Sequence, residues 1–428
     1  LTRTPSSNGN LKTMTYSLWV KRAGLGANLN MTFVVGESAI YFKSDDTIRA
    51  YDYTGSSFNF NLITNRKFRD TSAWYHIVIS IDTTQATASD RVKMYINGVQ
   101  ETSFSTETYP SQNTDLAHYN KSEINYIGAT NNSGYFDGSM SHFHFIDGTA
   151  YDASAFGETD STTGEWKINT SPSVTYGTNG FFILKDGNSV TDQSGNSNNF
   201  TVGGGTLTKT EDNPSNVFAT FNSLMHFRQP TPLLYGNTVI ENGDAQWENG
   251  YGTIATPTTG KFYAEFKYPV FGGGAYGHAG IIAVDDIATQ ASGYLNFGDT
   301  ANSWSISVTD GSVYNNASSI ATYSSISANG IIGLAIDCTN SKLYISVNGT
   351  WQNSADPSAG TGGISITSDK EYYVGGKVYN AYINANFGNG YFGTTAVSSA
   401  GTNASGNGIF EYDVPTGYTA LSTKGLNL

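Results

Sequence analysis

The side chains that could do chemistry in this chain are few and scattered. His142 and His144 stand two positions apart, so on a strand both imidazoles would lie on one face and could bind a transition metal, but no third ligand is evident. Glycoside hydrolysis needs paired carboxylates that face one cleft. Glu411 and Asp413 have the alternating spacing but lack the further acid of a Glu-x-Asp-x-x-Glu strand. We therefore predict that the protein is not an enzyme.

Nucleophilic catalysis has no better support. The sequence contains no Gly-x-Ser-x-Gly elbow. Cys338 is the only cysteine and follows an apolar strand pattern, where a small buried residue is the ordinary interpretation. A single cysteine also excludes an intrachain disulfide and a cysteine-based metal site.

Binding chemistry is better represented, because aromatic residues stand among Gly, Asn and Ser in segments that we predict to be loops. A ring held in a loop can stack on a sugar face, and polar neighbours can take the sugar hydroxyls. We predict the ligand-binding residues to be Tyr135, Tyr276, His278, Trp351 and Asn353. The alternative for Trp351 is that it folds back and covers one end of its domain.

Calcium is the metal that the sequence favours, and no other cofactor is expected. Hard cations prefer several oxygen ligands, which two acidic and amide-rich segments supply. The candidate ligands are Asp137, at the end of segment 131–137, and Asp186 with Asp192. Asp, Asn and Gly are also ordinary turn formers, and that interpretation stays open beside a calcium site.

The composition limits the class of partner. Charged residues make up 13% of the chain, against about 25% in an average protein, and the formal net charge is −13, from 22 basic and 35 acidic residues. Binding to nucleic acid through phosphate contacts is therefore excluded as a class. No apolar run approaches the roughly 20 residues of a membrane span, so we expect no membrane insertion.

The elements that must position these residues are predicted to be strands. Period-two alternation runs through 14–20, 74–81, 91–96 and 138–146, and again through 260–266, 331–337 and 342–347. Two of these strands end in Asn-Gly, at 97–98 and 348–349, the strongest short signal for a hairpin turn. Since no convincing helix appears, the predicted fold class is all-β, with two tandem antiparallel β-sandwiches.

The predicted domains are residues 1–207 and 226–428, joined by a linker at 208–225. The basis is the Gly-rich and polar stretch that runs from 203 to 216 and contains Pro214. The chain starts at Leu1 without an initiator Met or a signal peptide, so we expect it to be a fragment of a longer protein.

The first half resembles the laminin-G/pentraxin-like, concanavalin A-like jelly roll. The sequences WYHIV at 74–78 and MYING at 94–98 carry this resemblance, followed by 127–128 and 136–141 in matching order. Segment 192–200 resembles one that opens such domains but stands here at the end, which implies a circularly permuted order. The resemblance also implies calcium at a loop rim, although the family's acidic pattern is not fully matched.

The second half resembles a SPRY-type sandwich. Segment 260–266 is similar to its early strand, 333–337 with 343–345 to its central hairpin, and 386–388 to its late strand.

The combination of the two domains, with 212–220 between them and the ending 414–423, resembles surface appendage proteins of tailed bacteriophages, particularly marine phages. This resemblance implies a tail or head fibre on the virion surface that binds host-surface carbohydrate or protein without catalysis. Partners would include other virion proteins, and the implied assembly is a homotrimer. Two alternatives remain: a polysaccharide depolymerase with an unrecognised site, and a eukaryotic SPRY adaptor.

Overall fold

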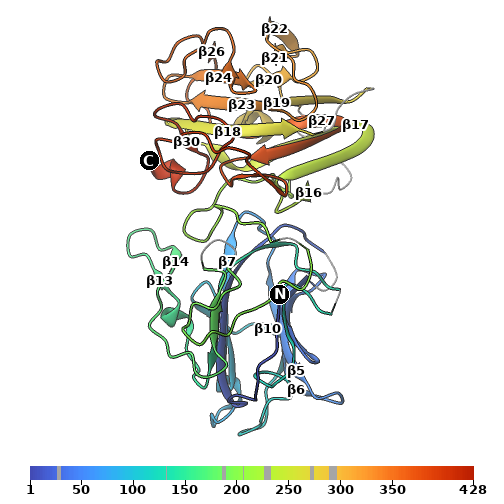
Figure 1. The fold of residues 1–428 in the computed structure, drawn as a ribbon, viewed down its shortest axis with the longest axis vertical. Coiled ribbons are helices and arrows are strands. Elements are labelled where there is room, and N and C mark those ends of the chain that lie inside the picture. Colours follow the sequence, from blue (N-terminus) through green and yellow to red (C-terminus); the bar gives the residue numbers. More distant parts are fainter. Residues whose placement is uncertain are drawn as a thin grey trace. The chain divides into compact units, whose positions relative to one another are not determined.

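Strands make up nearly the whole of the structure. The computed structural model describes residues 1–26, 30–131, 133–185, 189–205, 207–225, 233–269, 274–288 and 296–428. With 46% strand and 3% helix, it confirms the predicted all-β class. The chain divides into two units, Leu1–Lys209 and Thr210–Leu428 (Figure 1). No helix in these described ranges is long and apolar enough to span a membrane.

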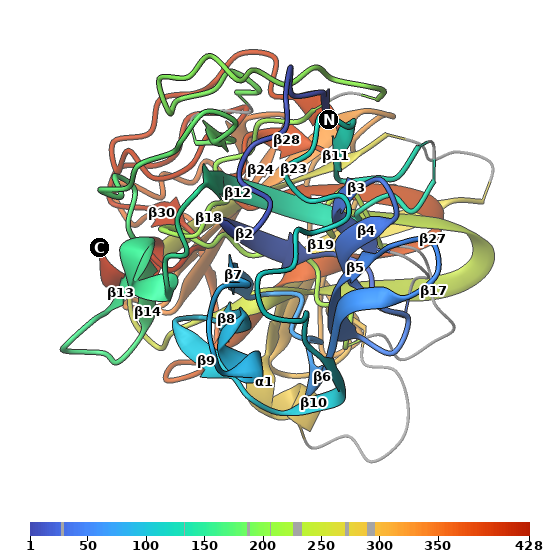
Figure 2. The same cartoon turned by 90° about the horizontal axis from the view of Figure 1, so that it is seen from below.

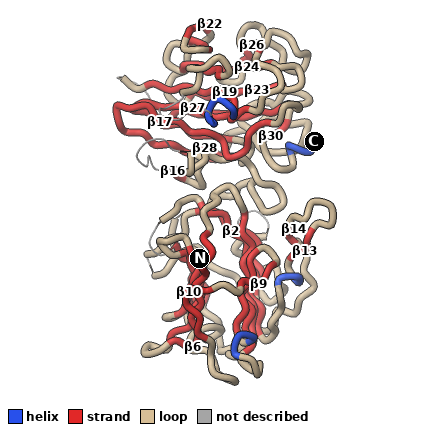
Figure 3. Tube along the Cα trace, turned by 180° about the vertical axis from the view of Figure 1, so that it is seen from behind, coloured by secondary structure: helices blue, strands red, loops and turns tan. Residues whose placement is uncertain are grey.

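The first unit is a sandwich of two antiparallel sheets, visible as two layers of strands in Figure 3. The seven-stranded sheet has, in spatial order, β1 (Thr2–Arg3), β11 (Asn125–Ile127), β3 (Asn30–Val35), β4 (Ser38–Phe42), β5 (Thr47–Tyr53), β6 (Phe58–Lys67) and β10 (Phe104–Thr108). The six-stranded sheet has β15 (Phe181–Ile183), β12 (Gly138–Asp147), β2 (Thr13–Arg22), β7 (Trp74–Asp82), β8 (Val92–Ile96) and β9 (Val99–Glu101). The hairpin β13 (Gly157–Thr159) and β14 (Trp166–Ile168) and two short 3₁₀ turns, Ala88–Asp90 and Ala153–Ala155, complete the unit.

Alternating side chains build the core between these two sheets. Leu18 of β2, Phe33 of β3 and Ile77 of β7 are fully buried in one apolar cluster. The turn between β8 and β9 confirms the first Asn-Gly prediction, because Asn97 and Gly98 both have positive φ, 47° and 80°. Such turns fix the register, and the register decides which face each side chain takes.

Segment 192–201 completes the first unit. Phe200 packs into the same apolar core, and Thr201 forms a β-bridge with Thr2. Asp192 organises the loop before it: the carboxylate accepts hydrogen bonds from the backbone of Phe182 (2.8 Å) and from the hydroxyl of Ser194 (2.7 Å). The pairing of this segment with β1 is this single bridge.

The second unit is built around one continuous sheet that folds over its own core. Its main path runs through β22 (Ser318–Thr322), β21 (Ser312–Asn315), β20 (Ser303–Ser307), β19 (Tyr276–Ala283), β27 (Tyr372–Asn386), β18 (Lys261–Tyr268), β23 (Gly330–Asp337), β24 (Lys342–Val347) and β25 (Thr350–Trp351). Off this path lie β16 (Leu233–Leu234), β17 (Val239–Thr256), β26 (Ile364–Ser365) and β30 (Thr419–Ala420), and β28 (Tyr391–Phe392) pairs with β29 (Thr395–Ala396). The helices of this unit are α1 (Val284–Ala288) and a 3₁₀ turn at Gly425–Asn427.

Strand β27 joins the two layers of this unit. Its first half pairs with β19 and its last residues pair with β18, while β17 runs along its other edge. Ile281 of β19, Leu334 of β23 and Val374 of β27 are fully buried in the core that the layers enclose.

The segment expected to be a linker, 208–225, contributes to the second unit from Thr210 onward. Phe218 and Phe221 are buried, and the backbone of Ala219 donates a hydrogen bond to the carbonyl of Leu421 (3.0 Å). The Gly-rich and polar stretch suggested a linker, but these apolar side chains anchor the segment by burial.

A buried carboxylate ties the C-terminal segment to this sandwich. Glu265 of β18 is fully buried and accepts hydrogen bonds from the backbone of Glu411 (2.8 Å) and Tyr412 (2.9 Å), the hydroxyl of Tyr263 (3.1 Å) and the amide of Asn386 (3.3 Å). Burial raises the pKa of Glu265 to about 7, while the donated hydrogen bonds act in the opposite direction.

Replacing Glu265 by glutamine at pH 8 is expected to destabilise the second unit by about 2–3 kcal/mol. The glutamine amide would bring two N–H groups into a site where all four partners already donate, so at least one donor would lose its acceptor. Urea unfolding followed by tryptophan fluorescence measures the change. Glu371→Gln, at an exposed position of the same unit, is the control, and equal stability of the two variants would contradict the interpretation.

Candidate functional site

Three aromatic rings form a row across neighbouring strands of the second unit. Trp247 of β17 and Tyr276 of β19 are both register partners of Tyr379 on β27. The ring centroids lie 5.6 Å (Trp247 to Tyr379), 5.8 Å (Tyr276 to Tyr379) and 6.3 Å (Trp247 to Tyr276) apart. Tyr276 is 45% exposed, and the other two rings are half-buried. The row therefore offers apolar ring surface to a ligand.

A polar row lies next to the aromatic row on the same three strands. Asn249 of β17 pairs with Lys377 of β27, which pairs with His278 of β19. The ammonium of Lys377 lies 4.9 Å from the centre of the Trp247 ring and 3.6 Å from Asp299. Burial lowers the pKa of Lys377, and Asp299 opposes that shift. The ion pair leaves this part of the site close to electrically neutral.

The hydrogen bonds of His278 fix its tautomer. The hydroxyl of Ser305 donates to the carbonyl of Phe297 (3.0 Å), so its oxygen must accept from Nδ1 of His278 at 3.1 Å. Burial holds the pKa of His278 well below its usual value, and Lys377 acts in the same direction. The imidazole is thus neutral, and Nε2 carries a lone pair that can accept a hydrogen bond.

The polar row also contains an acceptor without a donor. The Nδ2 group of Asn249 donates to Asn296 (3.1 Å), which in turn donates to Asp299 (2.8 Å). The Oδ1 atom of Asn249 is buried and has no hydrogen-bond partner among the described residues. The site therefore combines one exposed and two half-buried rings with a polar row that is buried beneath the surface, and ring surface of this kind suits a ligand with an apolar face.

The sequence predicted a loop at Tyr276 and His278, and this prediction is wrong, because both lie on β19. The glycines before and between them suggested a loop. Gly277, however, faces the core, where a Cβ atom would lie 2.6 Å from the ring of Tyr268. The glycine thus permits close packing within a strand. Trp247, Tyr379 and Lys377 were not among the residues predicted from the sequence, although alternation along β17 and β27 indicates one shared face.

The structure does not bring Trp351 to the aromatic row. Trp351 lies on β25 and packs against a separate apolar cluster that includes Tyr263, at 6.3 Å between ring centroids. Asn353 is exposed and donates to the carbonyl of Gly362 (3.1 Å). Tyr135, 67% exposed, belongs to the first unit.

The acidic candidates for calcium are also separated. Asp192 uses both carboxylate oxygens in loop hydrogen bonds. Asp137 stands seven positions before His144. His144 pairs with Phe182, whose backbone donates a hydrogen bond to Asp192. At about 3.3 Å per strand residue, the carboxylates of Asp137 and Asp192 are therefore roughly 20 Å apart. Asp186 lies outside the described residues. Within the described part of the chain, no cluster of three or more His, Cys, Asp or Glu side chains could hold a metal ion.

Two further candidates for chemistry, Cys338 and His144, are buried. Cys338 is a free, buried thiol, and burial raises its pKa to about 11. His144 stacks on Phe182 at 3.9 Å and hydrogen-bonds Tyr176 (2.9 Å). Tyr176 and Trp166 belong to the segment after β12 that packs on the outer face of the six-stranded sheet. The segment therefore covers Val78 and Ile146 on this face.

Comparison with known proteins agrees with part of the expected resemblance. Residues 2–155 match the family model described as "Concanavalin A-like lectin/glucanases superfamily". No curated protein matches the chain.

Solved structures similar to this chain include two SPRY domains and a toxin. The SPRY domain of human HERC1 is 14% identical, with 39% of this chain and 96% of that chain covered and a TM-score of 0.31. A second human SPRY domain is 13% identical, with 35% and 90% covered and a TM-score of 0.27. Stonustoxin is 14% identical, with 39% and 27% covered and a TM-score of 0.27. Of these similarities, the family match places a concanavalin A-like domain within the first unit, at residues 2–155.

Proposed function

We propose that the chain is an adhesion protein that binds carbohydrate, without catalysis, through the outer face of β17, β27 and β19. The observation that carries the proposal is the row of Trp247, Tyr379 and Tyr276 beside the polar row of Asn249, Lys377 and His278. Rings can stack on the apolar face of a pyranose. The match of residues 2–155 to the concanavalin A-like lectin/glucanases superfamily supports carbohydrate as the class of ligand.

Within this proposal, the chain acts as a phage-type appendage on the virion surface. The support is the resemblance of 212–220 and 414–423 to such proteins. The expected assembly is a homotrimer that binds host-surface glycan or protein. Sedimentation of a single monomeric species at high concentration would contradict the assembly but leave the carbohydrate site untouched.

Replacing Tyr276 or Trp247 by alanine is expected to weaken glycan binding about tenfold each, because a stacked ring contributes roughly 1–1.5 kcal/mol. A glycan array, probed with and without calcium, identifies the ligand, and calorimetric titration then measures its affinity. Tyr235→Ala is the matched control, since Tyr235 is a 56% exposed tyrosine of the same unit outside the aromatic row.

Trp351→Ala tests a second of the predicted binding residues. We expect this variant to lower the melting temperature and to leave binding by the folded protein intact. Lost binding with an unchanged melting temperature would move the site to Trp351, and unchanged binding in both Tyr276→Ala and Trp247→Ala would reject the aromatic row. New reducing ends after incubation with host polysaccharide would favour the depolymerase alternative instead.

A further inference from the structure

The structure assigns a second binding site, for a carboxylated sugar, to the outer face of the seven-stranded sheet in the first unit. Its centre is Arg49 of β5. The inference does not rest on the site proposed in the second unit, because it uses different residues on a different unit.

The outer face of this sheet is unusually rich in aromatic and aliphatic side chains. In one row across the strands, Tyr41 of β4 pairs with Arg49, which pairs with Ile63 of β6. In the next row Tyr51 pairs with Asn61. The opposite faces of the same strands build the core of the sandwich, so these strands are apolar on both sides. Solvent-facing sheet surfaces are ordinarily polar, and Arg49 is the cation in the middle of this one.

Arg49 is held in one position by its neighbours. Its guanidinium carbon lies 4.3 Å from the centre of the Tyr51 ring and 5.1 Å from that of Phe58. Nε donates to the side-chain oxygen of Asn61 (2.8 Å), and Nη1 donates to the hydroxyl of Tyr41 (3.3 Å). Asn61 and Tyr41 are themselves 8% and 7% exposed. The guanidinium group is therefore preorganised, and a ligand that binds it loses little side-chain entropy.

The charge of this guanidinium has no carboxylate partner. No acidic side chain among the described residues lies within ion-pair distance of Arg49, whereas Arg22 and Arg69 of the same unit both pair with Asp46. After the bonds to Asn61 and Tyr41, one hydrogen of Nη1 and both hydrogens of Nη2 have no acceptor in the described part of the chain. Two such parallel N–H groups match the two oxygens of a carboxylate. An unneutralised cation also stands out in a chain of net charge −13.

Exposed rings beside Arg49 indicate that the carboxylate belongs to a sugar. Phe58 is 39% exposed, and its ring centre lies 4.8 Å from that of half-exposed Tyr53. A ligand that consists of a carboxylate alone would contact only the guanidinium group of Arg49. A uronic acid would place its carboxylate on Arg49 and its apolar ring face on these aromatic rings.

Calorimetric titration of the full chain with trigalacturonate tests the proposal, and the methyl ester of the same trisaccharide is the second probe. The ester keeps the sugar ring and removes the negative charge. We expect trigalacturonate to bind at least tenfold more tightly than the ester, and Arg49→Gln to abolish that difference. Arg49→Lys should also lose most of this difference in affinity, because an ammonium group lacks the planar pair of donors. Arg66→Gln removes a cation from exposed Arg66 on β6 and should leave binding unchanged.

A third probe, a sulfated disaccharide, distinguishes carboxylate recognition from general attraction of anions. Equal affinity for the sulfated and carboxylated sugars, absence of trigalacturonate binding, or unchanged binding in Arg49→Gln at an unchanged melting temperature would each overturn the inference. Trp247→Ala separates the two sites: trigalacturonate binding that this variant removes and Arg49→Gln retains would belong to the second unit.

Discussion

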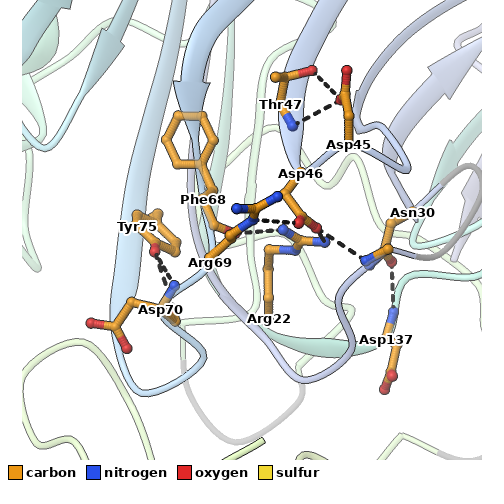
Figure 4. A network of polar contacts seen from close by, with 11 residues as sticks. Arg22, Asn30, Asp45, Asp46, Thr47, Phe68, Arg69, Asp70, Tyr75 and Asp137 are labelled. Atoms are coloured by element: carbon orange, nitrogen blue, oxygen red, sulfur yellow. Dashed lines mark hydrogen bonds and ion pairs between the residues drawn. The ribbon is translucent and has the colours of Figure 1, made fainter. Parts of the chain in front are cut away.

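Replacing Asp46 by asparagine is expected to destabilise the first unit by about 3–5 kcal/mol, the cost of removing one partner from a buried ion pair. Asp46 lies 3.0 Å from Nη2 of Arg22, whose side chain is fully buried, and 2.9 Å from Nε of Arg69 (Figure 4). Burial alone would raise the pKa of Asp46, but hydrogen bonds from Gly26, Arg69 and Arg22 outweigh it and lower the pKa. The neutral amide would remove the carboxylate that pairs with Arg22 and leave Asp137, which forms no ion pair with it, as the remaining negative charge nearby.

Asparagine is the sharpest substitution at this position because the backbone is unusual. Asp46 has a φ of 66°, in the left-handed region that asparagine tolerates better than most residues. The variant therefore changes the charge and leaves the turn between β4 and β5 intact.

Hydrogen exchange of peptides from β2 and β7, together with urea unfolding, localises the loss of stability to the first unit. Arg69→Gln removes the other partner of the Asp46 carboxylate. Because the side chain of Arg69 is 55% exposed, this variant should lose less than about 1 kcal/mol of stability. A similar cost for the two variants would mean that the pair of Asp46 with Arg22 is not the stabilising contact.

Acidification is expected to destabilise the first unit through His76. Its imidazole is fully buried between the rings of Trp19 (4.7 Å) and Trp166 (5.9 Å). Nδ1 accepts a hydrogen bond from the indole of Trp166 (3.0 Å), so Nε2 carries the proton and donates to the hydroxyl of Ser17 (2.9 Å). Burial lowers the pKa of His76 from 6.5 to about 3.

The sign of this effect follows from proton binding. Between pH 6.5 and about 3 the imidazole of His76 is protonated in the unfolded state and neutral in the folded state. Its contribution to the free energy of unfolding is therefore fully present above pH 6.5 and is lost as the pH falls. At 1.36 kcal/mol per pKa unit, the loss reaches about 3 kcal/mol by pH 4. Burial also holds the pKa of His144 well below its usual value. His144 therefore adds to the loss of stability at low pH.

Urea unfolding of the wild type and of His76→Gln between pH 7.5 and pH 4 measures this contribution. All carboxylates are common to the two proteins, so they cancel in the difference between the two stability curves. We expect the advantage of the wild type to shrink as the pH falls. Parallel curves would show that His76 is not the group that responds.

The amino-acid sequence by itself determined the strands and the tight turns. Alternation at 14–20 and 74–81 corresponds to β2 and β7, and the Asn-Gly pair at 348–349 forms a turn with positive φ at both residues. These features depend on near neighbours in the chain: the pleat places every second side chain on one face, and only a few residue types tolerate positive φ. Figure 2 views the same strands from below.

The tertiary structure alone decided which residues share a surface. Trp247, Tyr276 and Tyr379 are far apart in the sequence, and only the register of β17, β19 and β27 brings their rings together. Trp351 resembled an exposed loop residue, but the neighbouring cluster around Tyr263 partly buries it. Arg49 acquires its aromatic and amide neighbours only through the pairing of β5 with β4 and β6.

The physical reason is that strand pairing joins segments across loops of any length. A side chain's exposure and its cross-strand neighbours depend on that pairing, and local composition does not encode it. Glycine illustrates the limit: Gly277 suggested a loop, yet it lies within a strand because the ring of Tyr268 fills the space of its missing side chain.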